Sequence, residues 1–155
     1  ADVSIRVNDL ISTLKDKDKI IRGLREKLLI LEIDEIVKTT KQIEGIKVLA
    51  AQVDSPGMDA LRSIVDIARN KLGSAVIVLG SVHDGKVNLV TVVTNDLIDK
   101  GLHAGKLIKE VAKITEGGGG GRPEMAQAGG KNPAKLGEAL NLVTKLVEQQ
   151  LKNAV

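Results

Sequence analysis

The sequence predicts an α+β fold: a long N-terminal coiled-coil-like helical arm over residues 1–44, followed by a small mixed α/β globular domain over residues 45–155. Three observations lead to this prediction. Apolar residues recur in alternating steps of four and three through the first part of the chain, which is the spacing of a heptad seam. Runs rich in Val and Ile then alternate with amphipathic segments, as strands alternate with helices. The 155 residues are 43% hydrophobic without any Phe, Tyr or Trp, so aliphatic side chains must form the core.

The arm is predicted as one helix that needs a partner. Its seam is apolar except at one position and comprises Val3, Val7, Leu10, Leu14, Lys17, Ile21, Leu24, Leu28 and Leu31. A helix with such a seam is not stable alone. We expect it to pair with a second copy or with a neighbouring helix of a longer protein, since the chain begins within the helical pattern and without Met. Lys17 would either set the register of pairing or extend its ammonium group out of the seam, and we expect the latter.

The globular domain is predicted to begin where Gly45 ends the helical pattern. Residues 46–53 form the first strand. A helix over residues 58–72 follows, with Ser55 as its cap residue and Pro56 in its first position. Its apolar residues have helical spacing and comprise Leu61, Ile64, Val65, Ala68 and Leu72. Gly73 is predicted to end this helix.

A hairpin is predicted next. Residues 74–82 form a continuous apolar run, which is typical of a strand buried on both faces. Asp84-Gly85 is a preferred pair for a tight turn, so residues 87–94 return as an antiparallel strand. His83 beside the turn is interpreted as a surface residue. The hairpin means that the sheet is not purely parallel.

The last third is predicted as a connection over residues 95–101, a helix over residues 103–115, a glycine-rich loop and a final helix over residues 134–151. The buried stripes of the two helices are Ala104, Leu107, Ile108 and Val111, then Leu136, Leu140, Val143 and Val147. Residues 126–128 could add a short strand. Asn132 and Pro133 have the composition of a cap and a first helical turn.

The glycine-rich segment raises the main functional question. Gly117 to Gly121 are consecutive, and Arg122 and Pro123 follow. Glycine loses more conformational freedom on folding than other residues. Two interpretations are open: a slack linker in which Gly117 ends the preceding helix, or a backbone surface whose amides converge on an anion beside the Arg122 guanidinium.

The charge distribution draws attention to the same segment. Residues 100–135 contain seven basic and three acidic residues, a net charge of +4, whereas the whole chain has a net charge of +3. Lys106, Lys109 and Lys113 would form a ridge on the exposed side of their helix, although cations near a helix C-terminus are also favoured by its dipole. Lys131 and Lys135 flank the far side of the glycines.

Several classes of function find no support in the residues. The chain has no Cys and only two His, so thiolate and His-rich metal sites are excluded, and we assign no metal ligands. The glycine run lacks the terminal Gly-Lys-Ser/Thr of a nucleotide hydrolase's phosphate-binding loop. It also follows a helix rather than a strand, unlike a dinucleotide-binding fingerprint. Ser81 to Asp84 contain triad residue types, but neighbours in a strand and turn do not build a triad. We assign no catalytic residue. No apolar run or signal peptide indicates a membrane, so a cytoplasmic protein is expected.

Three segments carry a family resemblance. The C-terminal region of alanyl-tRNA synthetases is similar to "VLGSVHDGKVNLVTVVTNDL", "LHAGKLIKEVAKIT" and "GGGGGRPEMAQAGG". The resemblance covers at least residues 74–138, and the string from Arg122 to Gln127 makes it specific. It implies a globular fold shared with the domain that accompanies DHH-type phosphoesterases. Those proteins have a histidine where Arg122 stands, and no DHH motif is present here, so phosphoesterase activity is not expected.

The resemblance also implies a function. It predicts a module without an active site that binds tRNA(Ala) at the elbow and helps one tRNA serve the catalytic and editing domains of a parent synthetase. The helical arm would allow a homodimer. No cofactor is expected in this segment, whereas the parent enzyme would use ATP, Mg²⁺ and an editing-site Zn²⁺. The predicted RNA-binding residues are Gly117, Gly118, Gly119, Gly120, Gly121, Arg122, Lys106, Lys109, Lys113, Lys131 and Lys135. The alternative is a structural or dimerisation element without RNA contact.

Overall fold

A computed structural model describes residues 2–153 of the chain. It divides into two compact units, one up to Glu35 and one from Ile36 onward. The long helix is confirmed as α1 (Asp2–Val37). All nine predicted seam residues are exposed in the single chain, whereas Ile33 is buried. Pairing through the seam therefore stays a prediction. None of the helices within residues 2–153 is long and apolar enough to cross a bilayer.

The second unit contains a six-stranded sheet in the order β1-β2-β3-β4-β6-β5. The strands are β1 (Lys41–Ile43), β2 (Ile46–Gln52), β3 (Ala75–His83), β4 (Lys86–Val93), β5 (Gly118–Gly121) and β6 (Met125–Gly130). Among these six strands, β2 and β3 pair in parallel and the other four pairs are antiparallel. The predicted mixed α/β domain is thus confirmed, and the predicted β3–β4 hairpin turns at Asp84 and Gly85 with φ values of 51° and 73°.

Strand β1 contradicts the prediction that the helical pattern runs to Gly45. The helix ends at Val37, and the hydroxyls of Thr39 and Thr40 donate to the carbonyls of Ile36 and Val37, each at 2.6 Å. These bonds satisfy carbonyls that the end of the helix leaves free. The chain then forms a hairpin with β2. Its turn residues, Glu44 and Gly45, have φ values of 52° and 82°.

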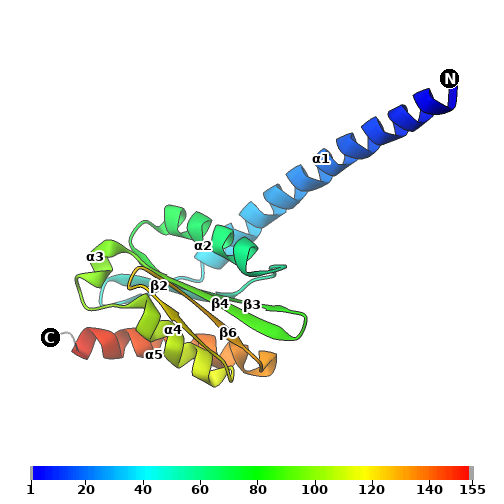
Figure 1. Cartoon of the computed structure of the whole chain (residues 1–155). Helices are drawn as coiled ribbons and strands as arrows, with labels where there is room; N and C mark the ends of the chain where they lie inside the picture. The colour runs from blue at the N-terminus through cyan, green and yellow to red at the C-terminus, as the bar shows by residue number, and fades with distance from the viewer. Residues whose placement is uncertain (1, 154–155) are drawn as a thin grey trace. The chain divides into compact units, whose positions relative to one another are not determined.

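Three long helices cover the two faces of the sheet (Figure 1). α2 (Met58–Leu72) lies on one face, mainly against β3 and β4. α4 (Ala104–Ile114) and α5 (Leu136–Asn153) lie on the other face. The predicted buried stripes are confirmed in all three, since every residue assigned to them is buried. The main core cluster joins α4 and α5 to aliphatic residues such as Val78 of β3 and Leu89 of β4.

Helix starts differ in detail from the predictions. Gly57, not Ser55, is the N-cap of α2, because Ser55 Oγ donates to the Gly57 carbonyl at 2.9 Å and is turned away from capping. A 3-10 turn (Pro133–Lys135) precedes α5, and the Asn132 side chain makes no capping bond.

The predicted connection over residues 95–101 contains a short helix, α3 (Asn95–Ile98). Asp96 lies in its first turn, where the Ser74 hydroxyl donates to the carboxylate. This hydrogen bond, followed by one from Thr94, lowers the pKa of Asp96 below its usual value.

Candidate nucleic-acid interface

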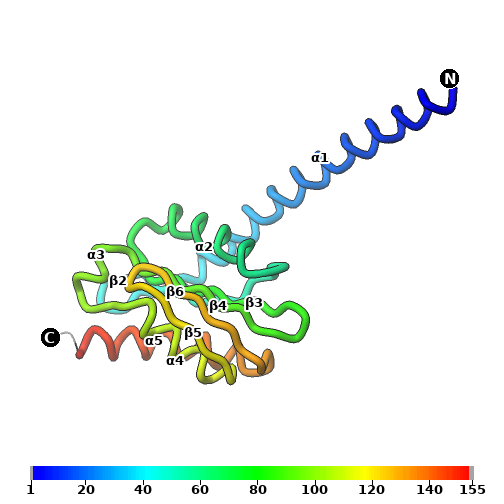
Figure 2. Tube along the Cα trace, in the orientation of Figure 1, coloured from blue at the N-terminus to red at the C-terminus, as the bar shows by residue number. Residues whose placement is uncertain are grey.

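The glycine run is a strand at the edge of the sheet. β5 pairs antiparallel with β6 in a register that places Gly118 opposite Gly129 and Gly121 opposite Ala126. Figure 2 shows β5 running beside β6 at the sheet's outer margin. The expected glycine-rich loop, and with it the slack-linker interpretation, is therefore wrong. An edge strand leaves backbone donors and acceptors without a partner strand on its outer side.

The end of α4 uses the first glycine of the run. The Gly117 N–H donates to the Ala112 carbonyl at 2.9 Å, and the Glu116 N–H donates to the Lys113 carbonyl at 3.2 Å. These two bonds form a Schellman motif. The left-handed residue of that motif is Glu116, with φ 57°, rather than a glycine. Gly117 thus contributes its amide to the helix end and its lack of a side chain to the strand that follows.

Alternate positions of the run differ in whether the fold requires glycine there. A Cβ atom at Gly117 or Gly119 would overlap the backbone of β6, and at Gly121 it would lie 2.6 Å from the Met125 carbonyl oxygen. These three glycines allow β5 and β6 to approach closely. At Gly118 a Cβ atom would meet nothing within 4 Å, and at Gly120 it would meet only Lys109 Cε at 3.3 Å.

Packing therefore does not explain Gly118 and Gly120. Neither has φ in the left-handed region that favours glycine. A glycine within a strand lowers stability by about 0.5–1 kcal/mol relative to alanine. Their effect is to leave the backbone of β5 without side chains at Gly118, which is exposed, and at Gly120, which is half-buried beside Lys109.

Arg122 lies at one end of this edge. Its side chain is 85% exposed, and its Nη1 is 3.8 Å from Glu124 Oε1, a loose contact that holds the guanidinium weakly. The backbone around it is fixed: the Arg122 N–H donates to the Met125 carbonyl at 2.9 Å, and the Pro123 carbonyl accepts from the Ala104 N–H at 2.9 Å. An exposed cationic group is thus carried by a turn whose backbone is held by hydrogen bonds.

The five predicted lysines do not form one cluster. Lys106 and Lys109 border a groove of about 290 Å³ between α4 and α5, and Lys109 also touches the Gly120 position. Lys131 borders a hollow of about 320 Å³ at the end of the hairpin opposite Arg122. Lys113 and Lys135 form ion pairs with Glu110 and Glu138 at 2.8 and 3.1 Å. Within residues 2–153, neither Lys106 nor Lys109 forms such an ion pair, and of the two it is Lys109 that lies beside β5.

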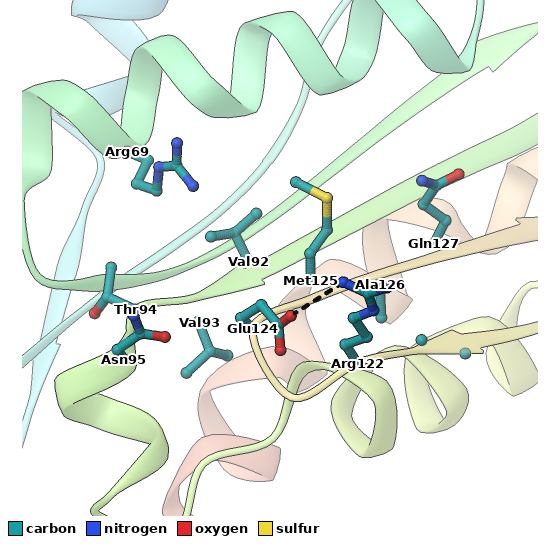
Figure 3. Close-up of a pocket in the computed structure, with 12 residues that line it drawn as sticks. Arg69, Val92, Val93, Thr94, Asn95, Arg122, Glu124, Met125, Ala126 and Gln127 are labelled. Carbon is teal, nitrogen blue, oxygen red and sulfur yellow. Dashed lines mark ion pairs between the residues drawn. The ribbon is translucent and has the colours of Figure 1, made fainter.

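A larger hollow, which the sequence does not predict, lies at the Arg122 end. Its volume is about 680 Å³, and its lining combines Gly120, Gly121 and Arg122 with residues from α2, β4 and β6. Arg69 of α2 is one of them (Figure 3). No local pattern could have indicated Arg69, because only the strand order β4-β6-β5 brings this helix near the glycine strand.

The residue types of a catalytic triad in the Ser81–Asp84 stretch do not come together as a site. Ser81 is buried, and its Oγ has no hydrogen-bond partner, whereas His83 is exposed at the turn with Nε2 3.4 Å from Asp84 Oδ2. The Ser81–Asp84 stretch thus forms no triad. Within residues 2–153, no three His, Asp or Glu side chains gather in an arrangement suited to a metal ion.

The mixed sheet with a glycine strand at its edge is the fold of a known class of domain. The family model described as the DHHA1 domain matches residues 45–149. The chain is 50% identical over 147 residues to an alanine–tRNA ligase from Pelotomaculum thermopropionicum and 51% identical over 150 residues to one from Bacillus subtilis. These matches cover 95% and 97% of the chain but only 17% of each ligase.

A solved structure adds detail to this likeness. The C-Ala domain from Aquifex aeolicus alanyl-tRNA synthetase superimposes with a TM-score of 0.64 and 30% identity, over 70% of this chain and 97% of that one. The chain belongs to the DHHA1 domain family, in the form represented by the C-Ala domain of alanyl-tRNA synthetases. The resemblance predicted from the glycine-rich segment is confirmed.

Proposed function

We propose that this chain is a tRNA-binding module of an alanyl-tRNA synthetase, which contacts the elbow of tRNA(Ala) and helps couple aminoacylation with editing. The observation that carries the proposal is the outer edge of β5, where Gly118 and Gly120 leave backbone bare without any packing reason. This edge lies in the section of the chain with a net charge of +4. A backbone edge without side chains, with cationic side chains nearby, suits a polyanion that must approach closely.

In the proposed mechanism, RNA is recognised by its shape and its sugar–phosphate backbone. Amides on the outer side of β5 donate to phosphate oxygens, and the Arg122 guanidinium adds a bidentate contact. Lys106 and Lys109 attract the RNA beside Gly120, and Lys131 does so at the other end of the hairpin. The chain has no aromatic residue for base stacking, so structured RNA is a better ligand for it than an unpaired strand.

The proposal assigns no chemistry to the chain itself. Catalytic and editing domains of a parent synthetase, present in the cytoplasm, would act on the bound tRNA. Those domains would hold the ATP, Mg²⁺ and editing-site Zn²⁺ that the family resemblance implies. The contribution of this module is to keep the tRNA attached while its acceptor end moves between sites, which raises the effective concentration of that end at each site.

The test compares two RNAs. Whole tRNA(Ala) is titrated against the 155-residue chain beside an acceptor-stem minihelix that lacks the elbow. We expect the whole tRNA to bind more tightly, with an affinity that falls as salt rises because counterions are released. Equal affinity for the two RNAs would remove the elbow from the proposal.

A second role rests on a separate observation. All nine seam residues of α1 are exposed in the single chain, including eight apolar ones. Burial of that seam against a second copy would make the arm a dimerisation element, alone or together with RNA binding. Sedimentation of the chain over a range of concentrations tests this role: a monomer at the highest concentration would argue against self-pairing.

A further inference from the structure

The sheet has a strip that the helices within residues 2–153 leave uncovered. On the face occupied by α2, that helix packs mainly on β3 and β4, and the strip beyond it belongs to β6 and β5. Ala126 and Ala128 of β6 are buried in the core on the opposite face, so the alternating residues Met125 and Gln127 turn toward the strip. Figure 3 shows both side chains extending toward the α2 side of the strand. The strip ends in the 680 Å³ hollow that Arg122 borders.

The lining of this hollow combines apolar and polar side chains. Val92 and Met125 supply the apolar surface, while Gln127 and Asn95 supply amide groups. These two amides can donate and accept hydrogen bonds at once, which is the pattern that reads the edge of a base. The volume of about 680 Å³ falls within the range of about 300–1,000 Å³ typical of small-molecule sites, which is large enough for a single planar ring with its sugar.

Two guanidinium groups flank this surface from elements far apart in the sequence. Arg69 extends from α2 and Arg122 from the turn between β5 and β6 (Figure 3). Their carboxylate contacts are long and exposed: 3.4 Å from Arg69 to Asp66 and 3.8 Å from Arg122 to Glu124. Such pairs contribute little to stability, so each arginine can exchange its carboxylate for a phosphate or a base plane at small cost.

We propose that the hollow between α2 and the β5–β6 hairpin receives one unstacked base of the bound RNA. Gln127 hydrogen-bonds the edge of that base, which lies on Val92 and Met125. Arg69 stacks on the base or holds its 5′ or 3′ phosphate, and Arg122 holds the phosphate nearest to β5. Arginine planes serve as stacking surfaces for bases in RNA-binding proteins, and here they substitute for the missing aromatic residues. This inference rests on the proposed function and adds base readout to it.

Chemical probing of tRNA(Ala) bound to the 155-residue chain tests the inference. Dimethyl sulfate and carbodiimide report on base edges, and iodine cleavage of phosphorothioate RNA reports on phosphates. We expect the wild-type chain to protect the edge of one or two loop bases. Gln127→Ala should abolish that protection, weaken binding roughly tenfold and leave the phosphate protections in place. Gln52→Ala, a matched change at an exposed residue of β2, should alter neither.

Arg69→Ala provides a second variant in case the Gln127 change disturbs the strand. It should weaken binding several-fold and alter the same base protections, whereas Arg62→Ala, on the same helix but outside the hollow, should not. Base protections that persist in both Gln127→Ala and Arg69→Ala would overturn the base site and leave the proposed function intact. A wild-type chain that binds no tRNA at all would overturn both.

Discussion

The four glycines of β5 fall into two pairs with opposite structural roles: Gly119 and Gly121 face β6, whereas Gly118 and Gly120 do not. Gly119 and Gly121 cannot accept even a methyl group, because β6 occupies the space where it would lie. Gly118 meets open space, and Gly120 meets only the flexible end of Lys109. The first set explains how the hairpin closes, and the second set explains what its outer edge can approach. A single run of five glycines therefore combines positions that the fold requires to be glycine with positions that it does not.

The largest effect on stability should come from adding a methyl group to a glycine that faces β6. Gly119→Ala places a Cβ atom against the Ala128 backbone, which cannot move without separating β5 from β6. We expect a loss of about 3 kcal/mol in the free energy of unfolding, at the upper end for overpacking. Urea denaturation followed by circular dichroism measures it. An unchanged midpoint would mean that the two strands are not held as closely as the structure indicates.

A smaller effect should come from removing the cationic side chain of Arg122, which follows β5. Arg122→Ala removes an exposed side chain without altering the backbone bonds that close the turn. We expect a loss of about 1.5–3 kcal/mol in tRNA binding, the range for hydrogen bonds to charged groups, and an unchanged unfolding midpoint. Arg62→Ala serves as the charge-matched control. Retained affinity in Arg122→Ala, or an equal loss in Arg62→Ala, would remove Arg122 from the interface.

The same comparison applies to the long-range attraction between lysines and RNA, because some lysines are paired with carboxylates and others are not. Changing Lys106 and Lys109 to Gln should reduce the slope of log affinity against log salt by about 1.4–1.8, since each phosphate contact contributes about 0.7–0.9. The double change of Lys113 and Lys135 removes the same charge from residues already paired with carboxylates, and it should reduce the slope less. Salt titrations of tRNA binding compare the two. Identical slopes would show that proximity to β5 does not matter.

Much of the fold could be predicted because its elements follow local rules. The stripe in α2 and the Asp84-Gly85 turn are fixed by spacing and by turn chemistry, and both are present as expected. Strand β1 could not be predicted so easily. It has only three residues, Lys41–Ile43, directly after a helical pattern, and it exists because β2 offers an edge to pair with. Whether a short segment forms a strand depends more on an available pairing partner than on its intrinsic strand propensity.

The glycine strand shows the same limit for the candidate site. Five consecutive glycines have low strand propensity, so a loop is the natural prediction, and the close approach of Ala128 and Gln127 cannot be deduced before β6 is placed. The charge pattern directed attention to Arg122 and the lysines, but it could not separate Lys109, which lies beside the Gly120 position, from Lys135, which is paired with Glu138. Arg69 could be placed near Arg122 only once the order of all the strands was known.

Gly118→Ala tests the central claim most directly, because it adds one methyl group where the fold has room for it. The free energy of unfolding and the affinity for tRNA(Ala) are measured on the same preparation. We predict that stability stays equal or rises by up to about 1 kcal/mol, while binding weakens roughly threefold to tenfold, a difference of up to 1.4 kcal/mol. Unchanged affinity together with unchanged stability would contradict the claim that the outer edge of β5 is the surface that RNA approaches.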